Sequence, residues 1–319
     1  MREPPRHRRF SDGRLHLQDG PIDLIIEAFG ERGEVERAYE GARERFHGVL
    51  DELCAELALL RSPASPGSSR PSGPVARRMY DAVAPFSRRA FITPMAAVAG
   101  AVAQEILGAM TNDARLDRAY VNNGGDIALH LTPGMSFRIA MIDRPDRPGA
   151  FGRAEIDADG PVRGVATSGR HGRSFSLGIA DAVTVLAASA AQADAAATLI
   201  ANAVDLPGHR AIRRAPASDL DPQSDLGERL VTRHVGPLSP GEIDAALARG
   251  WREAERMRRA GYIGAAALHL QGETRICGAP SLGARPSRAP VLSVYGGRDA
   301  RAPNGGDARA PMRNLHACH

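Results

Sequence analysis

The stretch GVATSGRHGRSFSLGIADAVTVLAASAAQADAAATLIAN, residues 164–202, decides how the rest of the chain is interpreted. It begins with a turn rich in Gly, Ser and Thr, passes through Asp181 into a β-branched run, and ends in an alanine-rich helix. In that helix Asp194, Thr198 and Asn202 are four residues apart, which places their side chains along one helical face. Donors in a loop followed by oxygen ligands on a helix indicate a site for an anionic ligand and a hard cation.

The composition is that of a globular chain without lysine. Its 319 residues include 43% hydrophobic ones, which is enough for a sizeable core. All 41 basic residues are arginine, so Schiff-base chemistry and a phosphate-binding loop with lysine are excluded. Residues 1–10 carry +3 and residues 278–319 carry +4, while the formal total is only +4. The body is therefore weakly acidic, and we predict no nucleic-acid partner.

Cysteine use and hydropathy favour a cytoplasmic protein. Cys54, Cys277 and Cys318 are odd in number and widely spaced, which predicts no disulfide framework and a reducing compartment. No apolar segment follows the basic start, and no window holds the ~18 apolar residues that a membrane span needs. We therefore expect a cytoplasmic location and no membrane partner.

Hydrophobic periodicity predicts an α+β fold, a single domain of antiparallel sheets flanked by helices. Residues 15–26 are typical of a hairpin, and apolar spacings of three and four predict one long helix over 35–60. Further helices are expected over 75–83 and 241–260, and further strands over 119–131, 136–142, 153–156 and 263–271.

The domain limits follow from composition. We predict a basic N-terminal extension over residues 1–11 and one domain over 12–277, in which the Pro/Ser-rich run 62–74 is a long loop. In residues 278–319 Pro, Gly, Ala, Ser and Arg alternate without a period, so we expect a disordered tail.

Two further segments have both a structural and a functional interpretation. Thr93 and Pro94 predict the start of a helix of small residues, which either packs tightly on a sheet or presents an exposed N-terminus to a phosphate. These two interpretations are compatible. The run NNGGD at 122–126 fits a tight turn between strands, and a turn alone accounts for it. A role for Asp126 in the site is the open alternative.

The strings NNGGDIAL, GVATSG, ADAVTVLA and AQADAAATLIAN, in this order, resemble the ApbE-like superfamily. The motifs cover about residues 90–204, and the layout covers most of 12–275. The runs PMAAVAGAVA and ATSGRHGRSFSLGIADAV are similar to a branch often labelled thiamine-biosynthesis ApbE-like. The resemblance implies a Mg²⁺-dependent FAD:protein FMN transferase, which splits FAD, passes FMN to a Thr or Ser hydroxyl of an acceptor protein, and releases AMP.

The same resemblance implies particular metal ligands and shows two departures. In the motif A-D-A-x-x-T, Asp194 and Thr198 would hold Mg²⁺, joined by the backbone carbonyl of Ala97. The segment H-x-x-D-P-x-T-G of the flavin transferases is absent, and residues 177–182 take its place. Gly100 stands where their helix has a lysine.

We predict Asp126, Arg170 and Arg173 as catalytic residues, with the two arginines as phosphate clamps. The predicted ligand-binding residues are Asn123, Gly124, Gly125, Thr167, Ser168, Gly169, His171, Ser174 and Asp181. A Mg²⁺-dependent protein that binds a nucleotide or flavin ligand, FAD or FMN, is the first interpretation. The alternatives are a cofactor-binding protein without transfer chemistry, and an enzyme of pterin or thiamine synthesis on the same scaffold. A homo-oligomer is compatible with all three.

Overall fold

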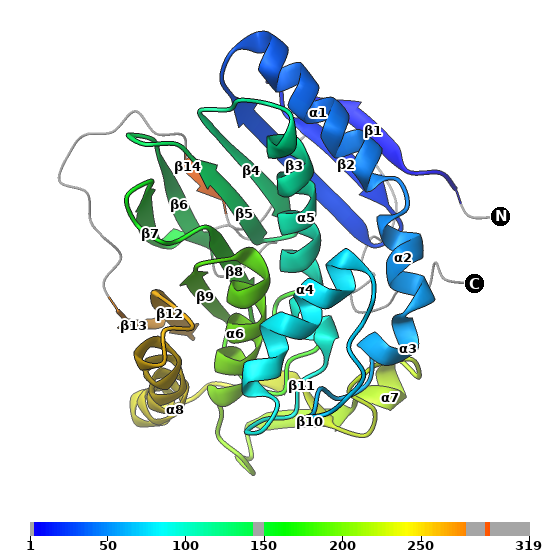
Figure 1. Cartoon of the computed structure of the whole chain (residues 1–319). Coiled ribbons are helices and arrows are strands. Elements are labelled where there is room, and N and C mark those ends of the chain that lie inside the picture. The colour runs from blue at the N-terminus through cyan, green and yellow to red at the C-terminus, as the bar shows by residue number, and fades with distance from the viewer. Residues whose placement is uncertain (1–2, 143–149, 279–290, 294–319) are drawn as a thin grey trace.

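An antiparallel sheet of nine strands forms the centre of the computed structural model (Figure 1), which describes residues 3–142, 150–278 and 291–293. Every pairing in this sheet is antiparallel. In spatial order its strands are β1 (Arg6–Arg9), β2 (Leu15–Asp19), β3 (Ile22–Phe29), β4 (Arg118–Asn123), β5 (Asp126–Leu131), β8 (Gly164–Ser168), β9 (Ala182–Ala187), β12 (Ala265–Leu270) and β13 (Glu273–Cys277).

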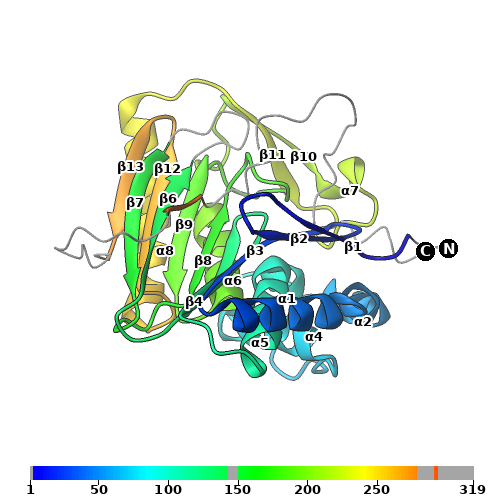
Figure 2. The ribbon, with the colours of Figure 1, turned by 90° about the horizontal axis from the view of Figure 1, so that it is seen from above.

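Helices cover one face of this sheet because its inner strands present an apolar side there. In β3 the side chains of Ile22, Leu24 and Ile26 are buried, and the residues between them are half-buried. The covering helices are α1 (Arg32–Phe46), α4 (Pro74–Val83), α5 (Val98–Asn112), α6 (Ala190–Ala203) and α8 (Pro240–Arg259). Figure 2 shows α1, α4 and α5 on one side of the strands. The short helices are α2 (Val49–Ala55), α3 (Leu57–Leu60), α7 (Ala217–Leu220), η1 (Ala84–Phe86) and η2 (Pro94–Ala97).

A smaller sheet packs on the opposite face. It contains β6 (Ser136–Ile142), β7 (Ala150–Asp157) and β14 (Val291–Ser293), and Phe137 and Ile139 pack against Leu129 and Val165 of the large sheet. A separate pair, β10 (Ile212–Pro216) and β11 (Leu230–Val235), completes the strands. The predicted α+β fold of antiparallel sheets flanked by helices is therefore confirmed.

Both predicted end segments contribute strands. Residues 6–9, placed in an extension by composition, pair with β2 as the edge strand of the large sheet. Residues 291–293 lie within the segment predicted to be disordered, yet they pair with β6 in parallel. Backbone pairing at a sheet edge has little sequence signature, which explains both differences. The rest of 279–319 lies outside the described residues.

The single helix predicted over residues 35–60 is instead α1, α2 and α3. Gly48 has φ +89° and separates the first two, because a left-handed residue ends the run of helical hydrogen bonds. The apolar spacing continues across this break, so periodicity did not reveal it. By contrast, the hairpin over 15–26 and the helices near 75–83 and 241–260 form as predicted.

The described residues include two of the three cysteines, and their helices can be checked for a membrane span. Cys277 is a buried free thiol, whereas Cys54 is disulfide-bonded. One disulfide-bonded cysteine does not make a disulfide framework, and the expected reducing compartment stays a prediction. Among the described residues no helix has the length and apolar character required to cross a membrane.

Candidate functional site

The candidate site begins at the tight turn between β4 and β5. Asn123 ends β4 and pairs across the turn with Asp126, the first residue of β5. Gly124 (φ +66°) and Gly125 (φ +117°) adopt backbone conformations that other residues rarely take. The Gly125 N–H donates to Asn122 Oδ1 over 2.9 Å. The NNGGD run therefore forms the predicted turn, and this turn fixes the position of the Asp126 carboxylate.

The N-termini of α5 and α6 press against each other at Gly100. A Cβ built on Gly100 would stand 2.3 Å from the Ala190 carbonyl oxygen and 2.8 Å from the Ala191 nitrogen. The Gly100 N–H donates to Asp194 Oδ2 over 3.1 Å. The Asp194 carboxylate of α6 therefore satisfies an N–H group at the positive end of α5.

The alternative in which the helix after Thr93 offers an exposed N-terminus is wrong. Residues 94–100 are buried, since the start of α6 lies against them. Thr93 is itself 2% exposed, and its hydroxyl donates to the Asp225 carboxylate instead of capping the helix. Tight packing, the other interpretation of this segment, describes the helix correctly.

Asp126 and Asp194 form a carboxylate pair between the sheet and the helices. Asp126 Oδ1 accepts the Thr167 N–H over 3.3 Å. Burial and the charge of Asp194 raise the pKa of Asp126 well above its ordinary value, although the Thr167 N–H and the Arg173 charge oppose this shift. Two carboxylates that repel each other favour either a retained proton or a bound cation between them.

Further oxygen atoms of the kind that a magnesium ion binds occur in β4, in α6 and at the start of α5. Asn123 is fully buried, and its Nδ2 donates to the Ala99 carbonyl over 3.1 Å. Its Oδ1 is also buried but has no hydrogen-bond partner among the residues that the structure describes. Thr198, 7% exposed on the same helix as Asp194, and the buried N-cap residue Ala97 add a hydroxyl and a carbonyl. An orphaned buried oxygen next to carboxylates is what an oxygen-preferring cation requires.

The donor set also limits which metals fit. Among the described residues no group of three or more His, Cys, Asp or Glu side chains gathers to hold a metal ion. A cation bound here would therefore rely on Asp126 and Asp194 together with neutral oxygens and ligand phosphates. Such a set suits Mg²⁺ better than Zn²⁺, because Mg²⁺ binds few protein carboxylates and keeps waters and substrate phosphates as ligands.

The carboxylate pair predicts an unusual pH dependence of stability. The pKa of Asp126 is raised in the folded state, so its protonated carboxyl contributes to the free energy of unfolding at low pH. This contribution is lost as the pH rises from the unfolded-state pKa of about 3.9 through the higher folded-state pKa. Asp126→Asn keeps an acceptor for the Thr167 N–H but has no charge. In a chelating buffer we expect the melting temperature of this variant to exceed that of the wild type by a margin that grows as pH rises. Each kcal/mol of difference in the free energy of unfolding corresponds to roughly 2–4 °C. A difference that stays constant with pH would contradict the assigned repulsion.

Arg173 is positioned to meet an anion at this turn. Its side chain is exposed and makes no hydrogen bond or ion pair within the described part of the chain. The guanidinium lies over Gly124, where an added Cβ would stand 1.7 Å from Nη2. Desolvation around the guanidinium lowers the pKa of Arg173, and the charges of Asp23 and Asp126 oppose this shift. Arg173 therefore lies over the turn that carries Asp126, and its role as a clamp stays a prediction.

Arg170 and His171, in contrast, are committed to Asp181. Arg170 Nε donates to Asp181 Oδ1 over 2.8 Å, and His171 Nε2 lies 3.1 Å from the same oxygen. The other oxygen, Oδ2, accepts the N–H of Gln271, a residue with φ +46°. Burial opposes ionisation of Asp181, but His171, Arg170 and the Gln271 N–H together hold its pKa below the ordinary value. This group fastens the loop to the β12–β13 turn, and the predicted clamp Arg170 is ion-paired within it.

The residues that replace the missing transferase segment pack against the end of α6. Asn202 Oδ1 accepts the Leu177 N–H over 3.0 Å, and Ile179 N–H donates to the Val204 carbonyl. A Cβ on Gly178 would stand 2.1 Å from the Ala201 carbonyl oxygen. Asn202, the third member of the predicted polar stripe, is thus used to hold this segment.

The remaining predicted residues line the loop that follows β8. Thr167 Oγ1 lies 2.8 Å from Thr184 Oγ1, which orients the backbone that contacts Asp126. Ser168 and Ser174 are half-buried. Gly169 packs so closely that a Cβ would stand 2.3 Å from the Asp181 carbonyl oxygen. The sequence did not predict that the Gln271 N–H binds Asp181 or that Asn122 Oδ1 accepts the Gly125 N–H. The only sequence signal for either residue is the turn beside it.

These features define an α+β protein with an oxygen-lined site between a Gly-Gly turn and the N-termini of two packed helices. A protein-family model described as AbpE bacteria matches residues 7–276, and the chain therefore belongs to that family. The resemblance to the ApbE-like superfamily is confirmed by this match.

Curated relatives and a solved structure are similar over parts of the chain. A UPF0280 protein of Methanothrix thermoacetophila is 40% identical over 132 residues, which are 41% of this chain and 52% of that protein. A UPF0280 protein of Methanoregula boonei is 33% identical, over 49% of this chain and 66% of that protein. The chain thus spans about half the length of the first of these curated relatives and less than two thirds of the second. The crystal structure of the ApbE protein of Thermotoga maritima aligns with 86% of this chain and 97% of its own, at 13% identity and a TM-score of 0.37.

Proposed function

We propose that this protein binds a flavin or nucleotide pyrophosphate, with FAD as the first candidate, together with Mg²⁺. The observation that carries the proposal is the convergence of the Asp126 and Asp194 carboxylates beside the unpartnered Asn123 Oδ1. A site with two carboxylates needs positive charge before it can accept a pyrophosphate. A divalent cation would supply that charge.

Each residue has a distinct role in this proposal. Asp126, Asp194 and Thr198 would hold Mg²⁺, with the carbonyl of Ala97 and Oδ1 of Asn123 as further oxygen ligands. When bound, the cation would neutralise the pyrophosphate and polarise the phosphorus under attack. Arg173, unpaired within the described chain and lying over Gly124, would contact the phosphate oxygens. Arg170, His171 and Asp181 would keep the loop that carries Arg173 in place.

Two outcomes of binding are chemically open to such a site. In the first, a Ser or Thr hydroxyl of an acceptor protein attacks the flavin phosphorus, the anhydride bond breaks, AMP leaves with the bonding electrons, and the hydroxyl proton passes to solvent. In the second, the protein holds the cofactor without turnover. The packing of residues 177–180 against α6 favours the second outcome, because these residues are fixed in a structural role.

Incubation with FAD and Mg²⁺, followed by chromatography for AMP, separates the two outcomes. Released AMP together with flavin retained on an added acceptor protein supports the transferase. Calorimetric binding of FAD that depends on Mg²⁺, without AMP, supports the binding protein. If FAD neither binds nor is cleaved at any Mg²⁺ concentration, the flavin proposal is wrong, and mass spectrometry of the co-purifying small molecule becomes the test for a pterin or thiamine ligand.

A cytoplasmic location belongs to the same proposal, since FAD and Mg²⁺ must both reach the site. Fractionation of cells that express the chain would test it, and recovery with the membrane or an exported fraction would contradict it.

A further inference from the structure

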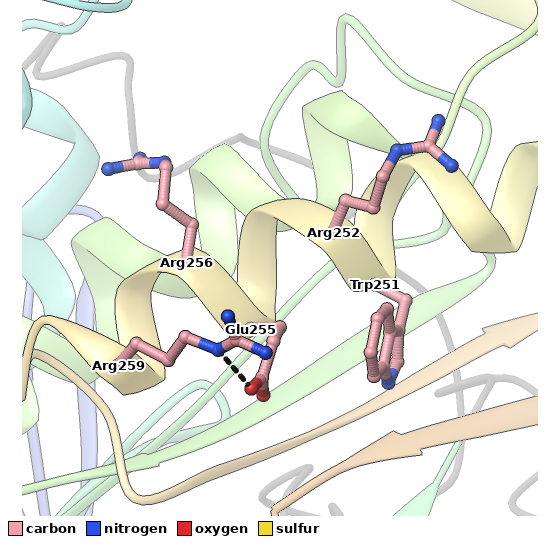
Figure 3. A pocket seen from close by; sticks show the side chains of 5 residues that line it. All are labelled: Trp251, Arg252, Glu255, Arg256 and Arg259. Carbon is pink, nitrogen blue, oxygen red and sulfur yellow. Dashed lines mark hydrogen bonds and ion pairs between the residues drawn. The ribbon is translucent and has the colours of Figure 1, made fainter.

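An arginine-rich groove on the outer side of α8 lies apart from the candidate site. It has a volume of about 340 Å³ and is lined by Trp251, Arg252, Glu255, Arg256 and Arg259. In Figure 3 Arg252 and Arg256 extend from the same side of the helix, and the Trp251 indole points toward the strands. The other faces of α8 pack on α6, β12 and β13. Trp251 packs in part against the hydrophobic core, and the arginines extend from the part of the helix that these elements leave uncovered.

The centre of this surface is apolar and rigid. The Trp251 indole N–H donates to the Ile276 carbonyl over 3.1 Å, which fixes the ring beside β13. Ile276 is 57% exposed, one of three large hydrophobic residues so exposed within the described chain. A fixed aromatic ring next to an exposed aliphatic side chain loses little conformational entropy when a partner covers it.

The rim of the surface carries excess positive charge. Arg256 pairs with Glu253, and Arg259, which is 75% exposed, pairs with Glu255. Arg252 is exposed and has no ion pair or hydrogen bond with any residue that the structure describes. Arg249, exposed one turn earlier, is likewise unpaired within those residues, so the helix presents more guanidinium groups than carboxylates.

We propose that this face of α8 docks an acidic segment of a partner protein, with Trp251 as its apolar anchor. Tryptophan and arginine, which line this groove together, are the residue types that often dominate protein interfaces. Charge complementarity selects the partner, because the unpaired guanidinium groups attract carboxylates and repel basic segments. The inference is independent of the flavin proposal, since neither set of residues contacts the other.

The single tryptophan of the chain makes the surface directly observable. Trp251 emission would be followed while a short peptide of alternating Glu and Leu is added, with a Lys-Leu peptide as the charge-reversed probe. We expect saturable binding of the Glu-Leu peptide alone. In the variant Arg252→Glu with Arg256→Glu the affinity for the Glu-Leu peptide should fall by roughly tenfold or more, because two attractions become repulsions.

The matched control is Arg37→Glu with Arg43→Glu, which makes the same charge change on α1, where both arginines form exposed ion pairs. Circular dichroism would confirm that both double variants remain folded. The proposal is overturned if the Glu-Leu peptide does not bind the wild type, or if both double variants lose affinity equally. Tighter binding of a single-stranded DNA oligonucleotide at the same face would also overturn it, in favour of a nucleic-acid partner.

Discussion

Replacing Asp194 with asparagine is expected to weaken Mg²⁺-dependent FAD binding by roughly 100-fold or more, because even outer partners of a metal ligand are worth 10–100-fold. The carboxamide can still accept the Gly100 N–H, so the contact between α5 and α6 should survive. The negative charge that Asp194 would offer to the cation is lost in Asp194→Asn. Calorimetry of Mg²⁺ and FAD binding to the variant measures this effect.

Alanine at the same position separates the structural role of Asp194 from its charge. Asp194→Ala leaves the buried Gly100 N–H without an acceptor, which costs about 1–3 kcal/mol. The alanine variant should therefore lose both binding and thermal stability, and the asparagine variant only binding. Asp219→Asn, which removes an exposed carboxylate from α7, is the control for net charge. Unchanged binding in Asp194→Asn would remove Asp194 from the metal site.

The fold was largely predictable because its core strands alternate and its long helices are amphipathic. The hairpin turning near Gly20 and the helix ending before Pro85 both follow from local patterns. The break at Gly48 was missed, since the apolar spacing runs through it. The edge strands β1 and β14 were missed for a different reason. They are fixed by backbone pairing, which side-chain patterns do not encode.

The candidate site was predicted in its parts, but not in its connections. The spacing of Asp194 and Thr198 and the turn at Asp126 were visible in the sequence. That Asp126 and Asp194 act on each other depends on how α6 lies against β5, which no local pattern reports. Arg170 was predicted as a clamp because its loop is rich in donors. The structure pairs it with Asp181, which is eleven residues away.

Glycine positions explain how these connections are built. Gly164, Gly178 and Gly100 each lie where an added Cβ would come within 2.3 Å of α6 or the residues leading into it. The helix is therefore held against β8, the 176–180 segment and α5 by backbone contact rather than by large side chains. Asp194 lies on this helix, so the same contacts that position α6 also position the carboxylate. A change at one of these glycines should disturb the site from a distance.

Among these changes, Gly100→Ala at the contact between α5 and α6 should destabilise the protein by about 3 kcal/mol or more. The new Cβ would stand 2.3 Å from the Ala190 carbonyl oxygen. The Cβ is fixed to the backbone of α5 and the oxygen belongs to the backbone of α6, so neither can rotate away. A lysine, which the resemblance to the flavin transferases implies at this position, would meet the same obstacle. Its absence here is thus a requirement of the packing between α5 and α6.

Gly108→Ala on the same helix is the matched control. No atom lies within 4 Å of the Cβ built at Gly108, and alanine favours a helix over glycine by roughly 0.5–1 kcal/mol. Urea denaturation should therefore show opposite signs for the two substitutions, although the chemical change is identical. A moderate separation of α5 from α6 in Gly100→Ala would also pull the Gly100 N–H from Asp194 and lower Mg²⁺ affinity. Equal stabilities of the two variants would show that the helices can part without cost, and that Gly100 does not set the position of Asp194.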